Sequence, residues 1–115
     1  MAKRVSALLL ALLLLTAGTA NAGGVYYEIF PSSYRDTDGD GVGDLAGVTA
    51  SAAYLQSLGV NGIWLTPFFS GASYHKYDVL DYQSVDSSLG TLEDFDALAG
   101  EYHARGMRVM LDLVI

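Results

Sequence analysis

The centre of the predicted fold is the stretch Gly62-Ile63-Trp64-Leu65-Thr66-Pro67. It is short, apolar and β-branched or aromatic, and it ends at a proline, which predicts a β-strand. Two further stretches share this character, Val25–Pro31 and Met107–Ile115. Their nearly continuous apolar sequence is typical of strands in a sheet whose two faces are both covered.

A helix is predicted between the first two strands. Val48, Ala52, Leu55 and Leu58 recur at helical spacing, and Gly59 is expected to end the helix. Because this helix lies between two apolar strands, it is expected to connect them as a crossover.

A second helix is predicted between Thr91 and Gly106. Thr91 with Asp94 three residues later resembles a capping box, with Asp in place of the usual Glu. The expected apolar face of this helix comprises Leu92, Phe95, Leu98, Ala99 and Tyr102. Residues 68–90 are expected to form a long polar and aromatic loop. The order strand, helix, strand, helix, strand predicts an α/β fold with parallel strands.

An acidic run lies between the first predicted strand and the first helix. Residues 36–44 read Asp-Thr-Asp-Gly-Asp-Gly-Val-Gly-Asp, and carboxylates so close together repel one another unless a cation lies among them. Oxygen ligands without His or Cys nearby favour Ca²⁺ over zinc or copper. The predicted ligands are Asp36, Asp38, Asp40, the backbone of Val42, and Asp44.

The spacing of these ligands also matches part of an EF-hand loop, with Gly41 at the sixth position. Gly47, however, takes the twelfth position, where an EF-hand needs a bidentate Glu, and Gly43 takes a position that is usually branched and apolar. A predicted strand, not a helix, precedes the loop. A calcium loop between strand and helix is therefore favoured, with an EF-hand and a metal-free acidic turn as alternatives.

The first 22 residues resemble a secretory signal peptide. Lys3 and Arg4 precede an apolar run over residues 5–15, and residues 20–22, Ala-Asn-Ala, fit a cleavage site. The alternative, a membrane anchor, needs about 18–20 apolar residues. We expect a secreted protein, extracellular or periplasmic, with no membrane association after cleavage.

Charge limits the classes of partner that the chain can bind, and cysteine content limits what can stabilise it. Without Lys3 and Arg4, four basic and 13 acidic residues leave a net charge of −9, which argues against nucleic acid. The chain has no Cys, so no disulfide can stabilise it, although calcium could supply local rigidity.

Several segments, in this order, together resemble glycoside hydrolase family 13, the α-amylase family. They are residues 25–31 with 36–47, 54–60 with 62–67, 74–82, 89–95 and 105–115. The catalytic domain of that family is a (β/α)₈ TIM barrel. The resemblance implies that residues 23–115 are the N-terminal portion of such a domain, about three of eight strands, and that the chain is a fragment of a longer protein.

The resemblance also implies a chemistry. Family members hydrolyse or transfer α-glucosidic bonds with retention, which needs two carboxyl groups about 5–5.5 Å apart. In the family these follow the fourth and fifth strands, with a third carboxylate after the seventh. No catalytic residue is therefore assigned in residues 1–115, and this segment alone is expected to be inactive.

Two substrate-binding residues are implied by the resemblance. Tyr77 would stack on the glucose ring beside the scissile bond, and Asp78 would accept hydrogen bonds from the hydroxyls of that sugar. The alternative is that Tyr77 packs in the loop and Asp78 caps a turn. Asp81 and Tyr82 are expected to hold the loop together, whereas the place of His75 stays open.

Three further residues refine this expectation. Lys76 replaces a glycine often seen in amylases, and similar His-Lys-Tyr-Asp loops occur in cyclomaltodextrinase-like members. Asp112 is expected to belong to the active-site framework, not to react. Trp64 is expected in the barrel core.

The expected protein is a secreted, calcium-stabilised, monomeric α-amylase-like hydrolase of α-1,4-glucans such as starch and maltooligosaccharides. The enzyme alternatives are an α-glucosidase, an oligo-1,6-glucosidase and a cyclomaltodextrinase-like enzyme. Two non-catalytic alternatives are a relative of the heavy subunits of amino-acid transporters, which needs a membrane span, and a small calcium-binding module complete at 115 residues.

Overall fold

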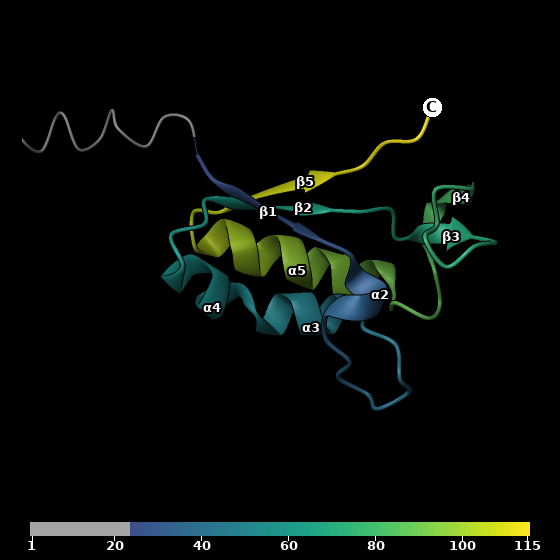
Figure 1. The fold of residues 1–115 in the computed structure, drawn as a ribbon, viewed down its shortest axis with the longest axis horizontal. Coiled ribbons are helices and arrows are strands. Elements are labelled where there is room, and N and C mark those ends of the chain that lie inside the picture. The colour runs from purple at the N-terminus through teal and green to yellow at the C-terminus, as the bar shows by residue number, and fades with distance from the viewer. Residues whose placement is uncertain (1–23) are drawn as a thin grey trace, which may run out of the picture.

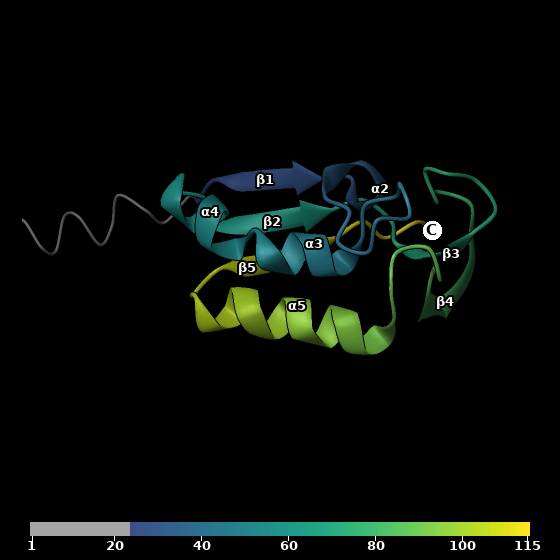
Figure 2. The same cartoon turned by 90° about the horizontal axis from the view of Figure 1, so that it is seen from below.

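The computed structural model describes residues 24–115, so the signal peptide predicted for residues 1–22 lies outside the described residues. The central sheet has three parallel strands in the order β1 (Tyr26–Ile29), β2 (Gly62–Leu65) and β5 (Arg108–Leu111), as Figure 2 shows. Gly62 is in register with Tyr26 on one side and with Arg108 on the other. The predicted parallel strands and crossover helices are confirmed.

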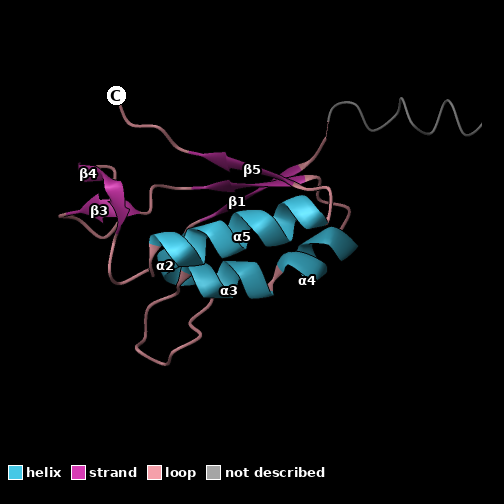
Figure 3. Cartoon of the chain, turned by 180° about the vertical axis from the view of Figure 1, so that it is seen from behind, coloured by secondary structure: helices cyan, strands magenta, loops and turns pink. Residues whose placement is uncertain are grey.

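Among residues 24–115, four helices accompany the sheet: α2 (Pro31–Tyr34), α3 (Leu45–Ala50), α4 (Ala52–Ser57) and α5 (Leu92–Ala104). Figures 1 and 3 show α3, α4 and α5 on one face of the sheet, and Figure 2 shows α3 beside α5. The buried residues between the two layers include Ile29, Ile63 and Leu65 from the strands and Val48, Leu55, Leu98 and Tyr102 from the helices. The sheet therefore presents its other face without a helix in the described part of the chain.

The first crossover helix differs from its prediction because it is broken. Asp44 caps α3 by accepting a hydrogen bond from the Gly47 N–H at 2.7 Å, so helical structure begins at Leu45, earlier than expected. Ser51 separates α3 from α4, with its hydroxyl bonded to the Gly47 carbonyl at 3.0 Å and its N–H bonded to Val48 O. This local hydrogen bonding competes with the regular helical ladder and divides the helix.

The second crossover helix, α5, begins at the predicted capping box. The Asp94 N–H donates to Thr91 Oγ1 at 3.2 Å, and the Thr91 N–H donates to Asp94 Oδ2 at 2.9 Å. Leu98 and Tyr102 are fully buried, whereas Leu92 is 49% exposed. The buried face of α5 is thus narrower than the one predicted.

The segment 68–90, predicted as a loop, contains an antiparallel hairpin of β3 (Phe69–Gly71) and β4 (Val79–Val85). Most of β4 is exposed, so the short alternation of apolar and polar residues over 80–83 corresponds to no buried face. The predicted third strand is also too long, because β5 ends at Leu111 instead of Ile115. Within residues 24–115, no helix has the length and apolar character needed to cross a membrane.

The chain between β1 and the acidic run also differs from its prediction. The first strand ends at Ile29, and the one-turn helix α2 follows, with Pro31 as its first residue. Proline suits this position because its missing N–H would have no partner in the first turn of a helix. The acidic run therefore lies between two helices, α2 and α3.

Candidate functional site

One carboxylate joins two aromatic side chains at the carboxyl end of the parallel sheet. Asp112 directly follows β5, and its Oδ1 accepts a hydrogen bond from the Trp64 indole N–H at 2.5 Å. Its Oδ2 accepts a hydrogen bond from the Tyr77 hydroxyl at 2.6 Å. The Asp112 N–H donates to the Leu65 carbonyl at 3.1 Å, which holds the residue beside the end of β2. This cluster thus brings together three segments that are far apart in the sequence.

The electrostatics of the cluster keep Tyr77 protonated. Its hydrogen bond to Asp112 is the largest of the effects that raise the pKa of Tyr77 to about 12, followed by burial and the negative charge of Asp112. The side chain is nevertheless 46% exposed. Tyr77 therefore offers an accessible aromatic ring whose hydroxyl is held in one place.

Asp78 is part of a tight turn next to Tyr77. Its Oδ1 accepts a hydrogen bond from the Ser73 hydroxyl at 2.6 Å, and its Oδ2 accepts one from the Ser73 N–H at 2.9 Å. The Ser73 hydroxyl is the largest influence on the pKa of Asp78 and lowers it below 3.8. The exposed carboxylate is ionised at neutral pH and keeps unused lone pairs, since a carboxylate can accept about four hydrogen bonds.

The other predicted residues of this loop have mainly local partners. His75 Nδ1 accepts the Tyr77 N–H at 3.1 Å, so the imidazole supports the turn. Asp81 accepts hydrogen bonds from the Gln83 N–H and the Ser84 hydroxyl, both at 2.8 Å. The Tyr82 hydroxyl donates to the carbonyl of Val114, which ties β4 to the chain after β5. Asp81 and Tyr82 therefore hold the loop together as expected.

Trp64 and Lys76 have contacts that no sequence pattern indicated. Trp64, expected in the barrel core, is half-buried and donates to Asp112. Lys76 is buried, and its Nζ lies 3.2 Å from Asp86 Oδ2. Its φ of +58° is a value that glycine adopts most easily, which gives a physical reason for the glycine often found there. Apart from the lysine in place of that glycine, nothing in the sequence indicated the ion pair between Lys76 and Asp86.

The structure brings three of the predicted metal ligands together. One carboxylate oxygen from each of Asp36, Asp38 and Asp40 lies within 4.8 Å of the others, and all three residues are exposed. Backbone N–H groups order this loop, since Asp36 accepts hydrogen bonds from Gly41 and Gly39, both at 2.8 Å. These bonds lower the pKa of Asp36, the bond from Gly41 being the largest cause.

The charge pattern in the loop suits a hard cation. The N–H of Asp40 lowers the pKa of Asp38, but the side chain of Asp36 and the nearby negative charges outweigh it, so the net pKa of Asp38 is raised. Partial desolvation also contributes to this rise, and repulsion by the negative charges of Asp36 and Asp40 acts in the same direction. A cation with oxygen ligands, such as Ca²⁺, would relieve that repulsion.

The other two predicted ligands are used differently. Asp44 is buried, and its Oδ1 accepts the Gly47 N–H while its Oδ2 accepts the N–H and hydroxyl of Thr37 at 2.9 and 2.8 Å. It is therefore not one of the three clustered carboxylates. The Val42 N–H donates to Asp40 Oδ1 at 2.8 Å, so Val42 also stabilises the loop through its backbone.

Two glycines explain the departure from an EF-hand. A Cβ on Gly43 would lie 2.2 Å from the Pro31 carbonyl oxygen, and a Cβ on Gly47 would lie 2.2 Å from the Arg35 carbonyl oxygen. The backbone approaches too closely for any side chain at either position. The Glu that an EF-hand requires has no room at residue 47.

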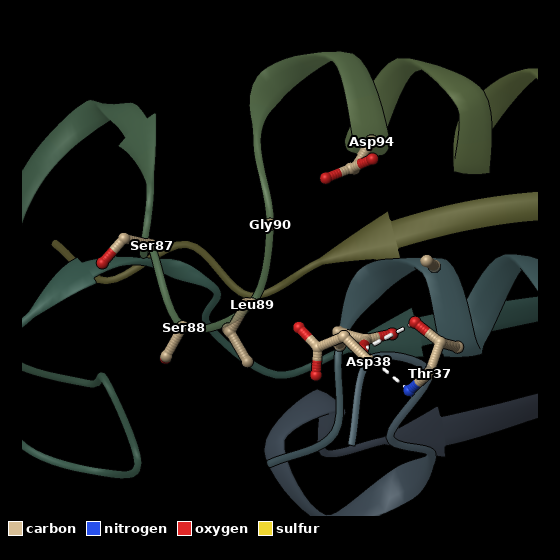
Figure 4. A pocket seen from close by; sticks show the side chains of 9 residues that line it. Thr37, Asp38, Ser87, Ser88, Leu89, Gly90 and Asp94 are labelled. Carbon is tan, nitrogen blue, oxygen red and sulfur yellow. Dashed lines mark hydrogen bonds between the residues drawn. The ribbon is translucent and has the colours of Figure 1, made fainter. Parts of the chain in front are cut away.

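A pocket of about 120 Å³ lies between the acidic loop and the turn that precedes α5 (Figure 4). Its polar lining residues are Thr37, Asp38, Asp44, Ser87, Ser88 and Asp94. The Leu45 N–H donates to the Leu89 carbonyl at 2.9 Å and joins the two segments. Because ligand pockets typically enclose about 300–1,000 Å³, this small pocket is not a site for a sugar.

Comparison with known proteins identifies the family. A family model described as the catalytic domain of α-amylase matches residues 28–115. The chain belongs to the α-amylase family. The resemblance stated from the sequence is thereby confirmed.

Similar proteins differ in their named activities. The chain is 51% identical over 94 residues to a probable α-glucosidase of Rhizobium meliloti strain 1021, and 48% identical over 92 residues to a trehalose-6-phosphate hydrolase of Escherichia coli strain K12. These matches cover 81% and 79% of this chain and 17% of each relative. The crystal structure of an α-amylase from H. orenii matches with a TM-score of 0.77 at 49% identity, covering 80% of this chain and 20% of that one. The chain thus spans about a sixth to a fifth of the length of these relatives.

Proposed function

We propose that the complete protein is a retaining glycoside hydrolase that acts on α-glucosidic bonds. The observation that carries this proposal is the Tyr77–Asp112–Trp64 cluster at the carboxyl ends of the parallel strands, with the ionised Asp78 beside it. Barrel enzymes assemble their active sites from the loops at this edge. The three strands would be part of a (β/α)₈ barrel, and the reacting carboxylates would come from its other strands.

The residues of this chain would bind and orient the sugar. The exposed ring of Tyr77 suits the apolar face of a glucose unit, and the bond to Asp112 keeps the ring from rotating out of place. Asp78 would use its free lone pairs to accept hydrogen bonds from sugar hydroxyls, because charge-assisted bonds are stronger than neutral ones. Fixing the sugar beside the reacting groups lowers the entropic part of the barrier.

The proposed substrates are α-1,4-glucans such as starch and maltooligosaccharides. The proposed enzyme is secreted and monomeric. The support is the acidic charge, the leader-like N-terminus and relatives named as α-amylases. Relatives named as α-glucosidases and oligo-1,6-glucosidases favour a second candidate, an enzyme that acts on short α-glucosides. Analysis of the products from starch and from maltotriose distinguishes these two candidates.

The function is tested with the complete protein and two variants, Tyr77→Leu and Asp78→Ala. Each variant is expected to lower kcat/KM on α-glucans or α-glucosides by about 100-fold, because the sugar loses its correct orientation. Tyr54→Leu is the matched control, since Tyr54 is also exposed but lies on α4. A wild-type enzyme without activity on any α-glucan or α-glucoside, or variants as active as the wild type, would refute the proposal.

We also propose that Asp36, Asp38 and Asp40 hold a structural Ca²⁺. The ion would neutralise the loop between α2 and α3, which Figure 1 shows extending from the helices away from the sheet, so its effect would be on stability. In the complete protein, replacing Asp38 and Asp40 together by Ala should abolish the rise in Tm that calcium produces relative to a chelator. Asp96→Ala, at an exposed aspartate of α5, should keep that rise. Equal melting of the wild type with and without chelator would exclude a metal here.

A further inference from the structure

We propose that Lys76 is a positioning residue whose buried ion pair with Asp86 holds the substrate-binding loop in its working conformation. This inference rests on the proposed function, because it assigns Lys76 a role through its neighbours Tyr77 and Asp78. It concerns the hairpin of β3 and β4, which Figure 1 shows at the carboxyl end of the central sheet.

The burial of the pair distinguishes it from an ordinary surface contact. The Lys76 and Asp86 side chains are 8% and 15% exposed, and their charged atoms lie 3.2 Å apart. A lysine is almost never buried to this extent unless it is paired. The second ion pair of the described residues, Glu101 with Arg105, is far more open, at 39% and 32% exposed.

The backbone of Lys76 adds a second, independent observation. Its φ of +58° is in the left-handed region, and it is the one residue other than glycine in the described chain with a positive φ. A side chain is unfavourable there, since glycine would adopt this conformation without strain. The lysine side chain therefore has to compensate through its contacts, and the pair with Asp86 is the contact that does so.

Asp86 is a firm anchor for this pair. Its Oδ1 accepts hydrogen bonds from the Ser88 N–H at 3.0 Å and the Ser88 hydroxyl at 2.6 Å, and its own N–H donates to the Phe68 carbonyl at 2.9 Å. Val85 directly precedes it and Leu89 follows three residues later, and both are buried in the main core. Asp86 is thus attached to the rigid part of the molecule.

The loop on the lysine side is mostly exposed and contains the substrate-binding residues. Tyr77 and Asp78 follow Lys76 directly, and both are exposed. Their contacts include the bond from Tyr77 to Asp112, the bond from the Tyr77 N–H to His75 and the bonds from Ser73 to Asp78. Lys76 is the residue that ties this segment to the core-anchored turn, so its loss would let both side chains leave their orientation toward the sugar. Small displacements of positioning groups reduce turnover strongly.

The test uses the complete protein with Lys76→Met, Lys76→Arg and Asp86→Asn. Methionine keeps the apolar stem and the same backbone demand but has no charge, whereas arginine keeps the charge. Lys76→Met and Asp86→Asn are expected to lower kcat/KM by about 10–100-fold, and Lys76→Arg is expected to restore most of the activity. Glu101→Gln, which breaks the exposed pair, is the matched control and should stay within about twofold of the wild type.

A double-mutant cycle shows whether Lys76 acts through the loop. In an Asp78→Ala background, Lys76→Met should cause a smaller further loss than in the wild type, because one of the two groups that it positions is already absent. Full additivity of the two losses would overturn the proposal, and so would wild-type kcat/KM in the folded Lys76→Met variant. If Asp78→Ala lowers activity and Lys76→Met does not, the proposed function stands and only the positioning role fails.

A second measurement does not depend on the substrate. If Lys76 orients the loop, Lys76→Met should loosen the bond between Tyr77 and Asp112 and move the Tyr77 pKa from about 12 toward its ordinary value of 10.0. Nuclear magnetic resonance of carbon-labelled tyrosine, assigned with Tyr77→Phe, follows this titration. An unchanged Tyr77 pKa in Lys76→Met would overturn the positioning role even if the enzyme acts on another sugar.

Discussion

Replacing Asp112 by Asn should release Tyr77 from its hydrogen bond. The Asp112 carboxylate accepts from Trp64 and from Tyr77, one bond on each oxygen. An amide has a single acceptor oxygen, and its NH₂ group would face the second donor. One of the two aromatic side chains therefore loses its partner, and we expect this to be Tyr77, the more exposed of the two.

The magnitude follows from the pKa of Tyr77. A rise from 10.0 to about 12 corresponds to about 2.7 kcal/mol of preference for the protonated phenol. Because the Tyr77 side chain is 46% exposed, solvent screening reduces its contribution to the free energy of unfolding to about 1 kcal/mol. Since the pKa is raised in the folded state, this stabilisation is fully present below pH 10 and is lost as the pH rises toward 12.

Two assays measure the effect of Asp112→Asn. Tyrosine resonance titration should show the Tyr77 pKa falling toward 10.0, and urea denaturation should show a loss of about 1 kcal/mol at neutral pH that diminishes above pH 10. Asp96→Asn, at an exposed aspartate of α5, should change neither quantity. The reasoning is refuted if Asp112→Asn leaves the Tyr77 pKa at about 12.

Three further predictions concern the packing of α5, all measured as midpoints of denaturant unfolding. Tyr102→Phe should lower the free energy of unfolding by about 1 kcal/mol, because the buried hydroxyl donates to the Val48 carbonyl at 2.8 Å and joins α5 to α3. An unchanged midpoint would contradict this prediction. Leu98→Ala should lower the free energy of unfolding by about 2–5 kcal/mol, because Leu98 is fully buried. Leu58→Ala, at a leucine that is 54% exposed, should lower it by less than about 0.5 kcal/mol. Equal losses in the two variants would be inconsistent with the core described. Thr91→Ala should cost about 1 kcal/mol through loss of the capping box, and no loss would show that the cap is dispensable.

The elements that the sequence predicted well are those whose signal is local. The capping box at Thr91 depends on residues three apart, and the strand around Ile63 depends on a short apolar run, so both are present in the structure. The hairpin of β3 and β4 escaped prediction, because β4 is mostly exposed and its pairing with β3 depends on a contact distant in the sequence.

The candidate sites show the same division. Asp36, Asp38 and Asp40 are two residues apart, and the loop brings them together as their spacing indicated. Asp44 belongs to the same run but is buried as the cap of α3, a role that depends on where the helix begins. Calcium binding itself stays a prediction for this loop.

The sequence by itself determined the alternation of strands and helices, the acidic loop and the family, because each is encoded in spacing along the chain. The tertiary structure alone decided which distant side chains meet. Trp64, Tyr77 and Asp112 come together because parallel strands end at one edge of the sheet, and Lys76 meets Asp86 because the hairpin folds back. Periodicity cannot reveal such pairs, because their contacts depend on how separate elements pack.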